Sequence, residues 1–525
     1  MPKAKHPLLR NLQRHVVTGN TVTAENKRFN KSFSRRDFLK TTGQAAAALG
    51  ISSLLPSCTH PIQIKPRVAI VGAGIAGLNA AHYLKTQNIA ADIYEASGRT
   101  GGRILTMKNS LLPGYTTEIG GEFIDSGHCE MITLAQKFGL ELKDNEQDPL
   151  NENGLNDTYF IGGKRYSLQQ VLAEFNHYKK AIDADFRSLG DNVDTPQAFR
   201  LDQLSIAAYF DKLGMNGWLR ILLENAYVAE FGLAAGEQSS LNFITMIADQ
   251  SDANKLQMYG ISDERFGIKG GNELVIEKLA DYVRPQINHY YQLAAISSKG
   301  RGYVLSFNNG REVFADFVIM AIPFTILRTV DMRIDNMSKE KLHAIKTLGY
   351  GNNSKLIMGF NKRIWRDNYH TPGYLFNEAI QNGWDSTHQQ HDNDSPGTYT
   401  IYTGAQRAKQ MADMAAQHNK HKDEYLPLMD NIFNGSKQAF NGNIVVADWP
   451  NQPLIRASYA AYKVGQWSTV AGLEAEPVDN LFFAGEHCSG DFQGYMNGGA
   501  ETGKQAAIDL LAKLNIQLQN QCESV

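Results

Sequence analysis

The 525-residue chain lacks the features that mark several large protein classes. Neither a GxSxG nor an HExxH motif is present, so common hydrolase and zinc-protease patterns are missing. No apolar stretch reaches the roughly 20 residues that a membrane-spanning helix needs. Cysteines are few and scattered without a CxxC pair, which argues against a disulfide framework: Cys58, Cys129, Cys488 and Cys522.

A net positive charge is found only in the first part of the chain. Residues 1–58 hold ten Lys or Arg and two Asp or Glu, a net charge of +8. The whole chain carries −2, so the remainder carries −10. Such an acidic body argues against nucleic acid as a partner, because binding to phosphates depends on lysine and arginine. The length predicts two or more domains.

The N-terminal region has the pattern of an export signal. Ser34–Lys40, SRRDFLK, places two adjacent arginines before a mild apolar run, as in twin-arginine signals. The run from about residue 45 to 55 suits the apolar core of a signal peptide. Cys58 is either the lipidated residue of a lipoprotein box or incidental to a plain signal peptide. We expect residues 1–65 to be signal and linker, and the mature protein to be periplasmic, with Cys58 as an alternative lipid anchor.

A dinucleotide-binding pattern follows this leader. Val68–Val71 is an apolar, β-branched run that predicts a buried strand, and Leu78–Lys85 predicts a helix. Between them lies Gly72-Ala73-Gly74-Ile75-Ala76-Gly77, a GxGxxG motif. A second strand is predicted over Ala91–Tyr94 and ends at Glu95.

Each part of this pattern has a physical reason. Gly72 permits a tight turn, Gly74 lets a pyrophosphate approach the backbone, and Gly77 lets the helix pack close to the strand. The helix N-terminus attracts phosphate. Glu95 lies 18 residues after Gly77, where an acid accepts hydrogen bonds from ribose hydroxyls. The motif alone does not separate NAD from FAD.

Further segments decide between these cofactors. The glycine motif is followed by EASGRTGGR, with Arg99 and Arg103, and by TEIGGEFID, residues 117–125. Six later blocks then appear in order: RFGIKGGNELVIEKLADYV, QLAAISSKGRGYVLSF, ADFVIMAIP, GNNSKLIMGFNKRIW, DWPNQPLIRASYAAY and LFFAGEHCSGDFQGYMNGGAETGKQAA. Together they resemble the flavin-dependent amine oxidase family of monoamine, polyamine and L-amino-acid oxidases, from about residue 66 to 512.

The resemblance implies an α/β fold of mixed type. A Rossmann-like FAD-binding domain would consist of residues 66–128, 256–330 and 440–515. A discontinuous substrate-binding domain of sheet plus helices would consist of residues 129–255 and 331–439. Helical patterns such as QQVLAEFNHYKKAIDADFRSL and AQRAKQMADMAAQHNK fall in the second set.

The resemblance also implies the residues that contact FAD. Gly485 and Glu486 would meet its ribityl and pyrophosphate region, and Leu293 its adenine side. The backbone N–H of Met496 would reach a carbonyl of the flavin ring and stabilise the negative charge of its reduced form. The full expected set is Gly72, Gly74, Ile75, Ala76, Gly77, Glu95, Ala96, Gly102, Arg103, Gly120, Gly121, Glu122, Phe123, Leu293, Gly485, Glu486 and Met496.

Four residues match catalytic positions of the family. Tyr459 and Tyr495 match the two aromatic walls that flank the amine nitrogen, although ordinary core tyrosines are an alternative. Lys355 matches a lysine that holds a water near flavin N5; the alternative is a lysine exposed at a sheet edge. Trp449 matches an aromatic residue near the flavin, and it would also serve as a packing tryptophan.

Some positions depart from the family pattern. Ser458 stands where covalent members carry the flavin-linking cysteine, so we expect non-covalent FAD. Ser97 replaces a frequent arginine, and one phosphate contact would then be missing. Glu122-Phe123-Ile124 occupies the place where L-amino-acid oxidases carry a carboxylate-binding arginine. This favours amines without a carboxylate, with Arg456 as the remaining candidate for gripping one.

The sequence therefore predicts an exported FAD-dependent amine oxidase. It would oxidise an amine to an imine by hydride transfer to flavin, with O2 reduced to H2O2. The alternatives are an L-amino-acid oxidase or tryptophan 2-monooxygenase-like enzyme, a flavin desaturase or isomerase, and a flavin-bearing binding protein without turnover. No metal is expected, because HQQHDND, His388 to Asp394, has the composition of a solvated loop. The identity of the amine and the oligomeric state stay open.

Overall fold

The computed structural model describes residues 66–148, 150, 157–248, 256–387, 390, 396–413 and 418–514. The predicted export signal, Cys58 and Cys522 lie outside these residues, as does nearly all of the HQQHDND stretch. Within the described part, the mixed α/β class is confirmed. Among the described helices, none combines the length and apolar character needed to cross a membrane.

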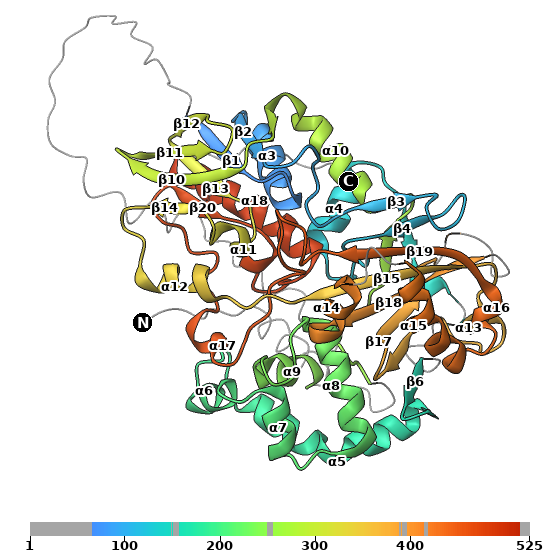
Figure 1. Cartoon of the computed structure of the whole chain (residues 1–525). Coiled ribbons are helices and arrows are strands. Elements are labelled where there is room, and N and C mark those ends of the chain that lie inside the picture. The colour runs from blue at the N-terminus through green and yellow to red at the C-terminus, as the bar shows by residue number, and fades with distance from the viewer. Residues whose placement is uncertain are drawn as a thin grey trace, which may run out of the picture.

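A five-stranded parallel sheet forms the upper part of the molecule (Figure 1). Its strand order is β20-β13-β1-β2-β9, and all neighbouring strands are parallel. The continuous apolar sequence VAIV of β1 is fully buried, as expected for a central parallel strand. The five strands are β1 (Val68–Val71), β2 (Ala91–Glu95), β9 (Ile287–His289), β13 (Phe317–Met320) and β20 (Leu481–Phe483).

Three helices cover this sheet: α3 (Ile75–Thr86), α10 (Glu273–Val283) and α18 (Met496–Lys513). The helices α3 and α18 approach closely at Gly503, which has no Cβ. A Cβ there would lie 2.1 Å from the Ala76 carbonyl oxygen. Asn79 also donates a hydrogen bond of 2.8 Å to the carbonyl oxygen of Ala500. The first helix of the chain's nucleotide-binding pattern is thereby joined to a helix more than 400 residues later.

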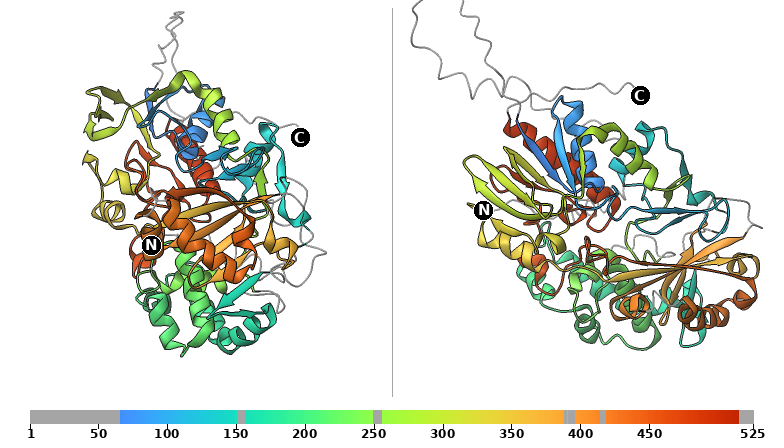
Figure 2. Two further views of the ribbon diagram at one scale, coloured as in Figure 1. Left: turned by 45° about the vertical axis from the view of Figure 1, so that its right-hand side comes forward. Right: turned by 45° about the horizontal axis from the view of Figure 1, so that its top comes forward.

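A seven-stranded sheet lies beside this unit, in the order β19-β15-β18-β17-β16-β6-β7 (Figures 1 and 2). Lys355 of β15 pairs with Tyr402 of β18, which pairs with Asn382 of β17, so these side chains share one face. The strands are β6 (Thr158–Ile161), β7 (Lys164–Tyr166), β15 (Asn353–Phe360), β16 (Leu375–Asn377), β17 (Gln381–Asp385), β18 (Gly397–Gly404) and β19 (Phe440–Asp448).

The domain limits given from sequence stay a prediction, but one difference is clear. The predicted return to the nucleotide-binding part at residue 440 falls at the start of β19. This strand pairs along its length with β15 and belongs to the seven-stranded sheet. Strand pairing across that segment could not be seen in the sequence, because β15 and β19 are separated by three other strands and several helices.

Helices α5 to α9 form the lower part of the molecule in Figure 1. The predicted helical run after residue 168 is confirmed as α5, which begins with a capping box between Ser167 and Gln170. Helix α8 packs against the seven-stranded sheet and brings its C-terminal turn to the centre of the protein. The bounds are α5 (Leu168–Arg187), α6 (Pro196–Asp202), α7 (Ile206–Lys212), α8 (Gly217–Phe231) and α9 (Ser240–Ile247).

The remaining elements connect these units. A four-stranded sheet, β12-β11-β10-β14, extends the nucleotide-binding part. Its strands are β10 (Leu293–Lys299), β11 (Gly302–Phe307), β12 (Glu312–Ala315) and β14 (Asp331–Arg333). Two small ribbons pair β3 (Thr106–Lys108) with β4 (Thr116–Glu118) and β5 (Leu142–Asp144) with β8 (Phe266–Ile268). The further helices are α4 (Cys129–Lys137), α11 (Phe324–Leu327), α12 (Lys339–Thr347), α13 (Ile364–Asp367), α14 (Ala405–Asp413), α15 (His418–Ile432), α16 (Ser436–Ala439) and α17 (Gln466–Thr469).

Candidate active site

A cavity of about 1130 Å³ runs from the carboxyl ends of β1 and β2 to the inner face of the seven-stranded sheet. Every residue expected from sequence to contact the cofactor or to act in catalysis lines this cavity, with Gly77 as the one exception. The lining therefore brings together segments that are spread over more than 400 residues of the chain. The individual roles of these residues stay predictions.

The glycine motif has the geometry that a pyrophosphate requires. Gly72 has a φ of +102°, and a Cβ there would lie 2.7 Å from the Ala321 carbonyl oxygen. A Cβ at Gly77 would lie 2.0 Å from the carbonyl oxygen of Gly72, so this glycine acts in packing. A Cβ at Gly74 would meet nothing within 4 Å and would only occupy space at the start of α3. That space, next to a helix N-terminus, suits a phosphate.

Glu95 ends β2 at the same edge of the sheet. Its Oε2 accepts a hydrogen bond of 2.9 Å from the Ala73 N–H, inside the glycine motif. Its Oε1 accepts two bonds of 2.8 Å from the N–H and the hydroxyl of Ser97. Ser97, which replaces a frequent family arginine, thus helps to fix the acid at the position expected for a ribose contact.

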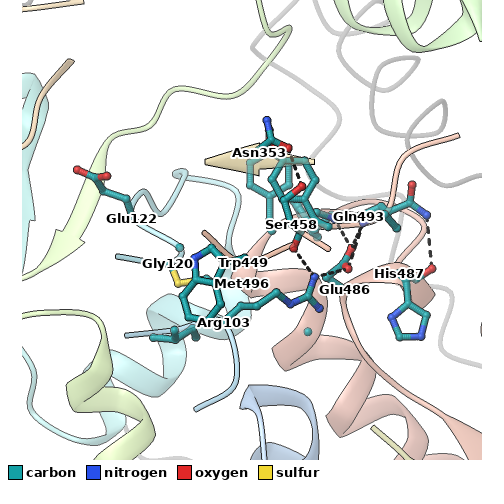
Figure 3. A pocket seen from close by; sticks show the side chains of 18 of the residues that line it. Arg103, Gly120, Glu122, Asn353, Trp449, Ser458, Glu486, His487, Gln493 and Met496 are labelled. Carbon is teal, nitrogen blue, oxygen red and sulfur yellow. Dashed lines mark hydrogen bonds and ion pairs between the residues drawn. The ribbon is translucent and has the colours of Figure 1, made fainter. Parts of the chain in front are cut away.

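The middle of the cavity is held by a network around Arg103 (Figure 3). Its Nη1 donates to Glu486 Oε1 at 2.8 Å and to the Ser458 carbonyl oxygen at 2.7 Å. Ser458 in turn donates its hydroxyl to Asn353 Oδ1 at 2.6 Å. This network links the segment after the glycine motif to three segments from the C-terminal third of the chain.

The double glycine of the GGEFID segment allows a close passage here. A Cβ at Gly120 would lie 1.8 Å from the Arg103 carbonyl oxygen, and one at Gly121 would lie 2.6 Å from Met496 Cγ. Only glycine therefore fits between the Arg103 segment and the first residue of α18. Trp449 borders the same place and donates its indole N–H to the Ile119 carbonyl oxygen at 3.0 Å.

His487 is a cavity residue that sequence reasoning missed. It is buried, and neither ring nitrogen has a hydrogen-bond partner among the described residues. Its ring lies 4.4 Å from that of Phe324 in an edge-on contact. Burial, followed by the charges of Arg103 and Lys341, holds its pKa well below the usual value, so the ring is neutral. An unpartnered buried imidazole on the cavity wall fits a site that accepts a polar cofactor.

Lys355 does not lie at a sheet edge, because β15 has β18 on one side and β19 on the other. Its Nζ donates to the Gly120 carbonyl oxygen at 2.8 Å, the Glu118 carbonyl oxygen at 3.2 Å and Glu122 Oε2 at 2.8 Å. All three of its N–H groups thus have protein acceptors, and Glu122 supplies the charged one. The expected role of this lysine in holding a water near the flavin stays a prediction.

The two predicted tyrosine walls both line the cavity. The Tyr459 hydroxyl contacts the Glu230 carbonyl oxygen and shares a 2.9 Å hydrogen bond with the Tyr402 hydroxyl. The Tyr495 ring lies 5.1 Å from that of His128. Burial raises the pKa of Tyr459 and Tyr495 well above the ordinary value, so both hydroxyls stay protonated. Tyr402 adds a third aromatic group that the sequence did not reveal.

Beyond the tyrosines the cavity is rich in carboxyl groups. Burial, followed by the charge of Asp125, raises the pKa of Glu230 to about 7 and that of Glu264 to about 8. Burial raises the pKa of Asp157 to about 7 and that of Asp125 to about 6. Glu264 also bonds with Tyr374, and Asp157 with Tyr159. The Glu230 carboxyl has neither a hydrogen bond nor an ion pair with any described residue.

No described lysine or arginine on the cavity wall neutralises these four acids. Arg99 bonds to backbone carbonyls, Arg103 pairs with Glu486, and Lys355 pairs with Glu122. Arg456, the candidate for gripping a substrate carboxylate, is exposed, and its Nε donates to the Pro453 carbonyl oxygen instead. It does not belong to the cavity lining.

Known proteins share this architecture. The family described as flavin containing amine oxidoreductase matches residues 75–511. The chain belongs to this family. Flavin-containing amine oxidase B of Sus scrofa is 22% identical over 467 residues, covering 85% of this chain and 86% of that protein. A putrescine oxidase bound to putrescine has a TM-score of 0.72 at 19% identity, covering 85% and 99% of the two chains. Cyclohexylamine oxidase from Brevibacterium oxydans IH-35A has a TM-score of 0.73 at 22% identity, covering 86% and 100%.

The protein is therefore an FAD-dependent amine oxidoreductase, and the cavity fits that cofactor. The glycine motif and the N-terminus of α3 would hold the pyrophosphate, Glu95 the ribose, and the start of α18 at Met496 the ring. When bound, FAD would act as the electron acceptor for amine oxidation, while the protein aligns the substrate and excludes water. In the described part of the chain, no group of three or more His, Cys, Asp or Glu residues could hold a metal ion.

Proposed function

We propose that this amine oxidoreductase acts on an amine that carries a second positive charge. The proposal is based on the group of four carboxyls beyond the tyrosine walls, none of which pairs with a lysine or arginine among the described residues. Burying a carboxylate without a partner is costly, and the raised pKa values express this cost. A cationic group of the substrate would supply the missing charge.

The reacting nitrogen itself must be neutral. The aromatic surface of Tyr459, Tyr495 and Tyr402 disfavours an ammonium through desolvation, although ring faces attract cations weakly. The substrate would thus place one nitrogen at the tyrosines and the flavin, and its charged end at Glu230. The putrescine-bound putrescine oxidase, which shares the fold, provides a precedent for a diamine in such a site.

The L-amino-acid oxidase alternative is less well supported. A substrate carboxylate would add a negative charge to a cavity that already holds four acids, and repulsion opposes this. Glu122 is itself an acid, and Arg456 is exposed and lies outside the cavity lining, so neither would bind that carboxylate inside the cavity. The Glu230 carboxyl next to the tyrosine walls suits a cationic amine, and no step of a desaturase, an isomerase or a binding protein without turnover requires it.

The proposal includes the fate of the electrons and the location. O2 would accept them from reduced FAD and yield H2O2, and the imine would hydrolyse to an aldehyde. We further propose that FAD is non-covalent, because Ser458 has no thiol for a thioether. The sequence pattern supports twin-arginine export to the periplasm, with Cys58 as the candidate lipid anchor.

Oxygen uptake by the purified holoenzyme tests this function. We would compare putrescine, butylamine and L-norleucine, which share a four-carbon chain but differ in charge, and assay peroxide and aldehyde in parallel. The expected order of kcat/KM is putrescine, then butylamine, with no turnover of norleucine. Preference for norleucine would establish the amino-acid oxidase alternative. Bound FAD without turnover of any of the three would contradict the proposal.

A further inference from the structure

The ammonium of Lys355 is enclosed by acceptors from a single segment. Two are carbonyl oxygens of Glu118 and Gly120, and the third is the Glu122 carboxylate, all within 3.2 Å of Nζ. The Lys355 side chain is 9% exposed and that of Glu122 is 10% exposed. The pair is therefore a buried salt bridge on the cavity wall, and its lysine has no N–H left for another ligand.

Glu122 is itself held at both oxygens. Oε2 accepts from Lys355, and Oε1 accepts from the indole N–H of Trp384 at 3.0 Å. The Trp384 ring also packs at 5.7 Å from Phe123 and 5.4 Å from Tyr402, and Tyr402 bonds to Tyr459. One carboxylate thus fixes the lysine to the aromatic wall of the substrate cavity.

The surrounding charges do not replace Glu122. The Glu118 carboxyl accepts from the Asn272 N–H and the Thr106 hydroxyl, so it is turned away from Lys355. Lys143 is a further, half-buried cation nearby, and it lies within electrostatic range of both Glu118 and Glu122. Removing the charge of Glu122 would leave the carbonyl oxygens of Glu118 and Gly120 as acceptors of Lys355 Nζ, with no carboxylate on it from any described residue.

We propose that Glu122 is a positioning residue that cancels the charge of Lys355 and thereby lowers the reduction potential of the bound flavin. Amine oxidation passes a hydride, two electrons with one proton, from the substrate carbon to the flavin, and leaves an iminium. The flavin ring becomes more negative in this step, so a nearby unbalanced cation favours reduction. With Glu122 in place the pair is neutral overall, so the charge of Lys355 does not stabilise the reduced flavin. The inference depends on FAD and on Lys355, but not on which amine is oxidised.

Removal of the lysine predicts a different result. In Lys355→Met, Glu122 would be a buried acid without a cation, and burial favours its protonated form. The neutral pair is then replaced by a neutral side chain and a neutral acid. The flavin potential is therefore expected to stay close to that of the parent. Glu122→Gln added to this variant should change nothing further.

The test is the reduction potential of bound FAD in purified holoenzyme, measured by dye equilibration during reductive titration without substrate. Glu122→Gln is expected to favour the reduced flavin at least tenfold, a positive shift of about 30 mV for a two-electron couple. Glu141→Gln is the matched control, because Glu141 forms an exposed pair with Lys269. It should leave the potential unchanged.

Two results would overturn the inference. One is a loss of thermal stability in Glu122→Gln with an unchanged potential, which means a purely structural salt bridge. The other is an equal shift when Glu122→Gln is added to Lys355→Met, which means that Glu122 does not act through the lysine. If Glu122→Gln alone loses flavin, the comparison of Lys355→Met with the double variant still tests the inference. These two variants are expected to have equal flavin potentials. A more positive potential in the double variant would contradict the inference.

Discussion

Replacement of Glu230 by glutamine removes a charge from the cavity but keeps the size of the side chain. A charge pair at 4 Å gains about 4 kcal/mol at an effective dielectric constant of about 20, which sets an upper bound. Glutamine still offers an oxygen, so the expected loss is the charge-assisted part, about 1.5–3 kcal/mol. This corresponds to a decrease of roughly 10- to 100-fold in kcat/KM for putrescine. For butylamine, which has no second charge, we expect a change of less than about threefold.

The assay is the ratio of kcat/KM for putrescine to that for butylamine, from pH 5.5 to 8.5. The pKa of Glu230 is about 7, so its carboxylate is mostly protonated at pH 5.5 and mostly charged at pH 8.5. The ratio should therefore rise with pH in the parent enzyme and rise less in Glu230→Gln. Taking the ratio cancels the titration of the reacting amine. Glu224→Gln, a change on the same helix at a residue paired with Arg220, serves as the control.

Two outcomes would refute this reasoning. An equal loss for both substrates would mean that Glu230 supports the fold of the cavity and does not bind a distal charge. An unchanged ratio across the whole pH range would mean that the second nitrogen lies elsewhere in the cavity.

Three further predictions concern the cofactor site and stability. Gly77→Ala should prevent folding or flavin binding, since its Cβ would lie 2.0 Å from a carbonyl oxygen, whereas Gly74→Ala should fold with reduced flavin content measured by absorbance. Asp148→Ala breaks a bidentate buried pair with Arg366 at 2.7 and 2.8 Å, so the free energy of unfolding should fall by roughly 3–5 kcal/mol, seen as a lower Tm. Asp211→Ala is the control: its pair with Arg220 is more exposed, and the loss should be less than about 1 kcal/mol. Six acids whose pKa is raised to about 7 or 8 bind protons in the folded protein that the unfolded chain has released: Glu118, Asp157, Glu230, Glu264, Glu474 and Glu501. Tm should therefore fall as the pH rises from 6.5 to 8, and a flat Tm there would contradict the assignment.

The nucleotide end of the cavity could be predicted from sequence for a physical reason. Its requirements are local: a tight turn at Gly72, open space at Gly74, close packing at Gly77 and an acid at the end of the next strand. All of these lie within 24 residues, so their spacing carries the information. The tyrosine walls and Lys355 could be predicted only through resemblance to the family.

The charged part of the cavity could not be predicted in this way. Asp157 precedes β6, Glu230 ends α8 and Glu264 precedes β8, so no spacing connects them. The one local signal was an acid in the apolar run NAYVAEFGL, which predicts a buried charge in α8. The partner of Lys355 was likewise hidden, because Glu122 lies 233 residues away and meets it only when β15 packs over the GGEFID segment.

Whether the cavity binds a second positive charge of the substrate can be measured by anaerobic mixing of the holoenzyme with putrescine or butylamine, followed by flavin absorbance. This measurement isolates substrate binding and flavin reduction from the choice of electron acceptor. We expect both amines to bleach the flavin, and putrescine to reach half of its maximal rate at a concentration at least about tenfold lower than butylamine. Equal concentration dependence for the two amines, or bleaching by L-norleucine alone, would contradict this expectation.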